Sequence, residues 1–109
     1  MARTITDPFA EFVDILSFNQ YIGWYDGLPD KCSKIQWNIT QNKPVVISEL
    51  GADALGGIHG DSLTRWSEEL QKYFFKENLK MGSKIRQLRG STPCILVDFR
   101  SPRRVLPGI

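Results

Sequence analysis

A short, unbroken apolar run, Val45-Val46-Ile47, is preceded by Pro44 and followed within four residues by a glutamate and a glycine. A proline has no N–H for an interior ladder, so Pro44 predicts the start of a strand. Three β-branched residues without a polar interruption are typical of a parallel strand that is covered on both faces. The glycine predicts a sharp backbone turn at the end. The run therefore predicts a buried parallel strand that ends at a carboxylate.

The rest of the chain repeats this arrangement of strand and helix. Residues 12–18 and 92–99 are apolar segments with a strand pattern. Helical spacing predicts a helix over about 28–40 and a longer amphipathic helix over about 62–81. Helices between successive strands imply parallel pairing with right-handed crossovers. The predicted fold class is therefore α/β, with three parallel strands and intervening helices.

Three carboxylates accompany these predicted strands, and Glu49 is the strongest candidate for chemistry. It follows its strand directly, and catalytic groups of α/β folds stand at the carboxyl ends of strands. Such a carboxylate could be a base, a nucleophile or a metal ligand, or simply a solvated or ion-paired side chain. Asp14 lies inside its predicted strand and could be a structural partner, while Asp98 could pair with an arginine.

An aromatic segment, Tyr21-Ile22-Gly23-Trp24-Tyr25, follows the amides Asn19 and Gln20 in a predicted loop. Aromatic faces beside amides suit a sugar, whose ring has an apolar C–H face and a hydroxylated rim. Alternatively, Trp24 and Tyr25 cover the end of the core. The sequence leaves both interpretations open.

The composition indicates one modest domain and excludes several functions. The chain has 109 residues and a net charge of +2, which is too mild for a nucleic-acid-binding protein. Its only basic cluster, at 100–104, is typical of a solvated loop. Two distant cysteines and one histidine predict no metal site, and we expect no cofactor. The sequence shows no membrane-spanning stretch and no secretory signal, so we expect a cytoplasmic protein without membrane partners.

Several motifs follow one another along the chain. The first is Ser17-Phe18-Asn19-Gln20-Tyr21-Ile22-Gly23-Trp24-Tyr25, and the second is Lys43-Pro44-Val45-Val46-Ile47-Ser48-Glu49-Leu50-Gly51-Ala52. Others lie in residues 56–60, 66–71 and 97–104. In this order they resemble the last third of the catalytic barrel of family 2 glycoside hydrolases, the β-galactosidase/β-glucuronidase family, and the resemblance covers nearly all of the chain.

The resemblance implies a (β/α)8 barrel, of which residues 1–109 would be a fragment holding strands six to eight. It implies retaining hydrolysis of a β-galactoside or β-glucuronide, so that the partner is a carbohydrate substrate. Glu49 matches the catalytic nucleophile. The substrate-binding residues that it implies are Asn19, Tyr21, Trp24, Tyr25 and Arg104.

The chain departs from the family pattern in two respects. The acid/base glutamate of the family lies on strand four, which has no counterpart here, and Cys94 stands where many relatives have a tryptophan. We therefore expect the isolated chain to be inactive. Three strands alone would leave two open edges and an exposed apolar inner face, so we also expect self-association. A non-catalytic carbohydrate-binding remnant and a purely structural α/β fragment are the alternatives.

Overall fold

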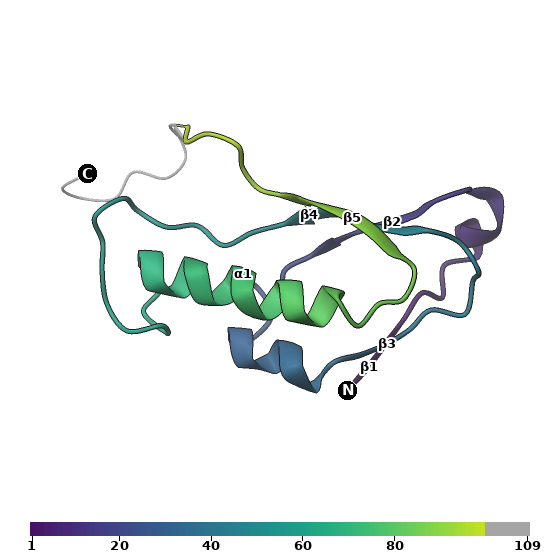
Figure 1. Ribbon diagram of the computed structural model, residues 1–109, viewed down its shortest axis with the longest axis horizontal. Helices are drawn as coiled ribbons and strands as arrows, with labels where there is room; N and C mark the ends of the chain where they lie inside the picture. The colour runs from purple at the N-terminus through teal and green to yellow at the C-terminus, as the bar shows by residue number, and fades with distance from the viewer. Residues whose placement is uncertain (100–109) are drawn as a thin grey trace.

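The computed structural model of the chain describes residues 1–99 (Figure 1). Its strands and helices follow one another in a mixed α/β order. In sequence they are β1 (Ala2–Thr4), the 3-10 helix η1 (Pro8–Phe12), β2 (Leu16–Gln20), the 3-10 helix η2 (Pro29–Lys34), β3 (Gln36–Asn38), β4 (Val45–Leu50), α1 (Glu68–Gly82) and β5 (Leu88–Pro93).

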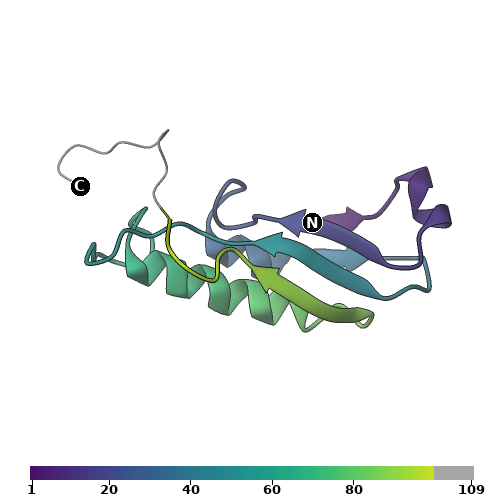
Figure 2. The same cartoon turned by 90° about the horizontal axis from the view of Figure 1, so that it is seen from above.

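The main sheet has three strands in the order β2-β4-β5, and all of them are parallel. Figure 2 shows the three arrows pointing the same way, with β4 between its two partners. Strands β1 and β3 form a separate parallel pair that the sequence did not predict. The prediction of an α/β fold with parallel strands is confirmed.

One face of the main sheet packs on α1 (Figure 1). Val45 and Phe74 are fully buried at 0 % exposure, and Ile47 and Leu50 are nearly so. No large apolar side chain of the three strands is exposed, and their exposed positions include Ser17, Asn19, Ser48 and Thr92. The expectation of an exposed apolar inner face is therefore wrong, because side chains alternate along a strand and the outward positions carry hydroxyls and amides.

The third strand lies earlier than the sequence predicted. β5 is Leu88–Pro93, whereas 94–99 forms no strand, and Leu96 is 96 % exposed. The polar residues Gly90 and Ser91 pair with Val46 and Ile47 of β4. Because β5 is an edge strand of the described sheet, it pairs on one side and needs few apolar residues, so its sequence resembles a loop.

The helices and the first strand also differ from their predicted bounds. The helix predicted over 28–40 is only η2, since Gln36–Asn38 pairs with β1 instead. The helix predicted from 62 begins at Glu68, where the Ser67 hydroxyl caps it by accepting from the Leu70 N–H at 3.1 Å. The strand predicted over 12–18 starts at Leu16, because Phe12 belongs to η1, which Asp7 caps by accepting from the Phe9 N–H at 2.9 Å.

The molecule is a flat slab of 49 × 29 × 19 Å with a radius of gyration of 15.6 Å. A self-contained domain of this length has a radius of gyration of about 13 Å. Within residues 1–99, no helix has both the length and the apolar character needed to cross a bilayer. The slab shape means that one face of the sheet has no covering layer among the described residues.

The full burial of Phe74 makes it a test of this packing. We expect Phe74→Ala to lower the free energy of unfolding by about 3–5 kcal/mol, because it removes buried area and leaves a cavity under the sheet. Urea unfolding followed by circular dichroism, at one fixed protein concentration, measures the change. Phe12→Ala is the matched control, since Phe12 is 78 % exposed and should cost little. Equal losses in both variants would contradict the assignment of the core.

Candidate active site

Glu49 lies at the carboxyl end of β4, the middle strand of the sheet. Its side chain is half-buried. The pairing with β2 is irregular at this point, because Phe18 pairs with Ile47 while Asn19 pairs with Glu49. Ser48 is therefore an extra residue on β4, and two consecutive β4 residues lie opposite Asn19.

This irregularity allows Asn19 to contact both residues. The Ser48 hydroxyl donates to Asn19 Oδ1 at 2.9 Å, and Asn19 Nδ2 donates to Glu49 Oε2 at 3.0 Å. The contact with Ser48 occupies the amide oxygen and leaves the NH2 group facing Glu49. Ser48 was not predicted from the sequence as a member of the site. The signal that could have identified it is a hydroxyl next to Glu49 on a strand that pairs with Asn19.

Tyr21, one residue beyond β2, provides the second contact to Glu49. Its hydroxyl is hydrogen-bonded to the Glu49 carboxylate. Burial raises the pKa of Tyr21 well above its ordinary value of 10, and the hydrogen bond and charge of Glu49 raise it further. The hydroxyl is therefore protonated at neutral pH and donates to Glu49.

The two remaining aromatic candidates have different environments. Trp24 is 4 % exposed, its ring packs edge-on against Trp66 at 5.3 Å, and the Arg65 guanidinium lies 3.7 Å above it. Tyr25 is 63 % exposed and stands edge-on to Tyr21, with their ring centroids 5.1 Å apart. Of these two, Tyr25 presents its ring to solvent, whereas Trp24 covers the end of the core.

The chain after β5 passes very close to the end of β4. The Cys94 N–H donates to the Leu50 carbonyl at 2.7 Å, and a Cβ on Gly51 would lie 2.8 Å from the Cys94 carbonyl oxygen. Gly51 is therefore required by the close approach of another backbone, and the sharp turn predicted from the sequence is not the reason. Burial raises the pKa of the Cys94 thiol, and the negative charge of Glu49 adds to this.

The other predicted carboxylates do not contribute to this cluster. Asp14 is exposed and precedes β2, and Asp98 is exposed beyond the end of β5. The predicted substrate residue Arg104 lies outside the described residues. Among residues 1–99, no group of three His, Cys, Asp or Glu side chains is arranged to hold a metal ion. In the described cluster, the Glu49 carboxylate is therefore held by an amide and a phenol.

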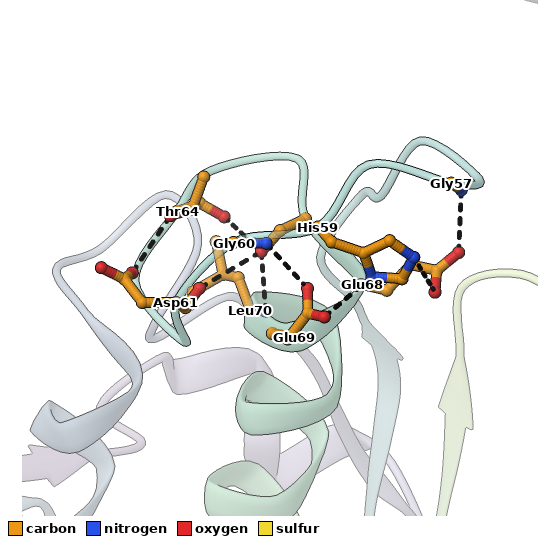
Figure 3. A network of polar contacts seen from close by, with 9 residues as sticks. Gly57, His59, Gly60, Asp61, Thr64, Glu68, Glu69 and Leu70 are labelled. Atoms are coloured by element: carbon orange, nitrogen blue, oxygen red, sulfur yellow. Dashed lines mark hydrogen bonds and ion pairs between the residues drawn. The ribbon is translucent and has the colours of Figure 1, made fainter.

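A polar clasp, formed by His59, Glu68 and Glu69, ties the loop beyond Glu49 to the first turn of α1 (Figure 3). His59 Nδ1 lies 2.8 Å from Glu69 Oε1, and Nε2 lies 3.7 Å from Glu68 Oε2. The same carboxylates accept the backbone N–H groups of Gly57 and Gly60 at 3.0 and 3.2 Å. Carboxylates in a first helical turn also interact favourably with the helix dipole. The clasp therefore holds residues 57–60 of the loop against the start of α1.

Comparisons of the sequence and of the structure with known proteins identify relatives of this chain. The β-glucuronidase of Felis catus is 31 % identical over 113 residues, which cover 92 % of this chain and 17 % of that protein. The solved structure of the Faecalibacterium prausnitzii β-glucuronidase gives a TM-score of 0.73 at 27 % identity, over 95 % of this chain and 20 % of that one. The homologues of the present chain are β-glucuronidases of glycoside hydrolase family 2. This chain matches one part of them.

Another β-glucuronidase shows the same fold. The Ruminococcus gnavus enzyme, solved in complex with uronic isofagomine, gives a TM-score of 0.72 at 23 % identity, over 87 % of this chain and 18 % of that one. No family model matches the chain. The chain spans less than a fifth of the length of the β-glucuronidase from Felis catus, so statements about the activity of a whole β-glucuronidase are proposals for this chain.

The clasp gives a pH-dependent prediction. The adjacent Glu69 carboxylate, and then Glu68, raise the pKa of His59 above its ordinary value of 6.5. A raised folded-state pKa means that the contribution of protonated His59 is complete below about pH 6.5, as long as Glu69 is ionised, and is lost as the pH rises through the raised value. We therefore expect the N–H groups of Gly57 and Gly60 to lose protection above that pH, measured relative to the base-catalysed exchange rate of an unprotected amide. NMR titration of the single histidine measures the pKa directly.

The matched control for this titration is a second acidic residue away from the clasp. Glu69→Gln should return the pKa of His59 toward 6.5, whereas Glu11→Gln should leave it raised. An unchanged midpoint in Glu69→Gln would show that the clasp does not form in solution.

Proposed function

We propose that the chain is the nucleophile-bearing part of a retaining β-glycosidase, with Glu49 as the nucleophile. One observation carries this proposal. Glu49 lies at the carboxyl end of the central parallel strand and accepts hydrogen bonds from the Asn19 amide and the Tyr21 hydroxyl. Both donors approach the carboxylate from the preceding strand and its following turn. This arrangement holds the carboxylate at the edge of the sheet where the carboxyl ends of β2 and β4 lie.

In retaining hydrolysis, a carboxylate oxygen attacks the anomeric carbon and forms a covalent glycosyl-enzyme intermediate. In that attack Glu49 loses its negative charge to the new C–O bond, and the leaving oxygen takes a proton from a second carboxyl group. Two hydrogen-bond donors on Glu49 restrict its rotation, which keeps the carboxylate in position for attack. Tyr21 remains protonated in this step, because burial and Glu49 both raise its pKa.

The second carboxyl group of such a pair would stand about 5–5.5 Å from Glu49. The side chains that hydrogen-bond to Glu49 among residues 1–99 are an amide and a phenol. General acid catalysis typically contributes a factor of about 10²–10⁴ in rate. We therefore propose that the 109-residue chain does not turn over substrate by itself and forms a site together with further strands of a (β/α)8 barrel.

The proposed substrate is a β-glucuronide, because the relatives in both comparisons are β-glucuronidases. The R. gnavus relative binds uronic isofagomine, which resembles such a sugar in carrying a carboxylate. In this proposal Asn19, Tyr21 and Tyr25 contact the sugar, and Arg104 keeps its predicted substrate-side role. A sugar contact by Trp24 would require Arg65 and Trp66 to move away from its ring.

A second candidate is carbohydrate binding without catalysis, which the exposed ring of Tyr25 favours. Saturable binding of a uronic sugar that is lost in Tyr25→Ala but kept in Glu49→Gln would support it. A cytoplasmic location remains a prediction from the sequence.

The nucleophile is tested by grafting the chain in place of the matched segment of the F. prausnitzii β-glucuronidase. We expect the chimera to hydrolyse a chromogenic β-glucuronide and Glu49→Ala to abolish that activity. Azide should restore release of the chromophore, because the azide ion attacks the anomeric carbon from the vacated side and expels the aryloxide. The product should be the α-glycosyl azide. The isolated chain, assayed in parallel, should show no turnover above buffer.

The control for the chimera is Glu11→Ala, which removes an exposed carboxylate in η1 and should keep full activity. An active Glu49→Ala chimera, or azide rescue that yields the β-azide, would refute the assignment of Glu49. Turnover by the isolated chain that Glu49→Gln abolishes would support the nucleophile and refute the proposed inactivity.

We further propose that the isolated chain self-associates. Strands β2 and β5 each have one edge without a partner in the described sheet, and unpaired edges favour pairing between chains. Phe9 and Phe12 add exposed apolar surface at 67 % and 78 % exposure. We expect light scattering at micromolar concentration to give a mass above that of one chain, which falls on dilution. A compact monomer that is stable over the same concentration range would contradict this.

A further inference from the structure

Two buried amide side chains form a network between β2 and α1 that the proposed chemistry does not use. Gln20, the last residue of β2, is 4 % exposed, and Asn78 in the middle of α1 is 5 % exposed. The Gln20 Nε2 group donates to Asn78 Oδ1. A buried amide is costly unless its hydrogen-bonding groups are satisfied, so this pair needs further partners.

Those partners are mainly the backbone groups of Ile22. The Ile22 N–H donates to Gln20 Oε1 at 2.6 Å, and Asn78 Nδ2 donates to the Ile22 carbonyl at 3.0 Å. Asn78 Nδ2 also donates to the Phe74 carbonyl of its own helix at 2.9 Å. The two amides therefore hold both polar groups of one loop residue and connect that residue to α1.

The residue held in this way directly follows Tyr21. Gln20 precedes Tyr21 and belongs to the sheet, while Ile22 follows it and is held by the two amides. The Tyr21 carbonyl accepts the Trp24 N–H at 3.0 Å, which closes the turn beyond. Both chain neighbours of Tyr21 are therefore fixed, and its side chain has little freedom to leave Glu49.

We propose that Gln20 and Asn78 are positioning residues that hold the Tyr21 hydroxyl on the Glu49 carboxylate. They act on the backbone on either side of Tyr21 and touch neither Glu49 nor the proposed sugar. Through these two amides, the helix α1, which covers one face of the sheet (Figure 1), contributes to the geometry of the site. The catalytic meaning of this contact rests on the proposed function, but the contact itself does not.

The test reads the ionisation of Tyr21 in the chain without substrate. Tyrosine labelled with ¹³C at Cζ reports ionisation by NMR, and Tyr21→Phe assigns its signal among the three tyrosines. At pH 10.5 an ordinary tyrosine is mostly ionised, since its pKa is about 10. Tyr21 should remain protonated at that pH, because burial and Glu49 raise its pKa.

In Gln20→Met the side chain keeps its approximate size but loses both hydrogen bonds. We expect the midpoint of the Tyr21 titration to fall below that of the unaltered chain, because the hydrogen bond and charge of Glu49 no longer favour the neutral phenol. Gln71→Met is the matched control. It replaces a glutamine by methionine in α1, and the hydrogen bond that it removes, from Gln71 Nε2 to the Ala52 carbonyl at 2.8 Å, does not involve Ile22. The control should leave Tyr21 protonated.

Circular dichroism at the same pH shows whether each variant is folded. If Gln20→Met unfolds, the double variant Gln20→Met/Asn78→Leu removes both amides, so that neither is left buried without its partner. A folded Gln20→Met or double variant in which Tyr21 titrates as it does in the unaltered chain would overturn the proposal. Hydrogen exchange of the unaltered chain gives a further test that needs no variant. An Ile22 amide that exchanges as fast as the Gly56 amide would also overturn the proposal.

These outcomes are independent of hydrolysis. Loss of the Tyr21–Glu49 contact in Gln20→Met supports the positioning role whether or not the chimera is active. An inactive chimera with an intact contact would refute the proposed function and leave the positioning role standing.

Discussion

The structure depends on β4 being paired on both sides while α1 covers one of its faces. Ile47 and Leu50 are buried against the helix, and Val45 is buried against Ala10, Leu16 and Ile85, so β4 cannot slide along β2 without exposing them. A shift by one residue would turn every buried side chain to the other face. Because β4 is fixed in this way, the position of Glu49 at its carboxyl end is also fixed.

The local irregularity between β2 and β4 then determines what Glu49 contacts. The extra residue, Ser48, places two polar side chains opposite Asn19 where a regular ladder would place one. Such irregularities re-aim side chains at functional sites. On the far side of the sheet, the amides of Gln20 and Asn78 fix the turn that carries Tyr21. The described site is therefore assembled from elements on both sides of one strand.

Much of the fold could be predicted from local sequence signals. The strand at Val45–Leu50 has a continuous apolar run, and the Asp7 cap of η1 has the usual side chain for its position. Strand β5 could not be predicted, because Gly90 and Ser91 pair with β4 without providing an apolar pattern. The same holds for β3, whose pairing with β1 depends on residues more than 30 positions apart. Contacts between residues far apart in sequence determine that β3 and β5 are strands, and local strand propensity does not.

The candidate site divides in a similar way. Asn19, Tyr21 and Glu49 lie together, because parallel strands bring their carboxyl ends to one edge. The choice between a sugar-facing and a core-covering role for Trp24 could not be made from the sequence, since it depends on Arg65 and Trp66 some forty residues later. No sequence motif marks Ser48 or the buried amides of Gln20 and Asn78. Their roles follow only from the contacts of β2 with β4 and with α1.

The hydrogen bonds around Asn19 all run in one direction. Ser48 donates to Asn19, and Asn19 donates to Glu49, so the side-chain amide has an acceptor end and a donor end that cannot exchange places. An aspartate at position 19 has the same shape but only acceptors, and it would set two carboxylates against each other. A small residue such as alanine would merely leave space for water at this exposed position. The isosteric replacement is therefore the more damaging one, which reverses the usual ranking of substitutions by size.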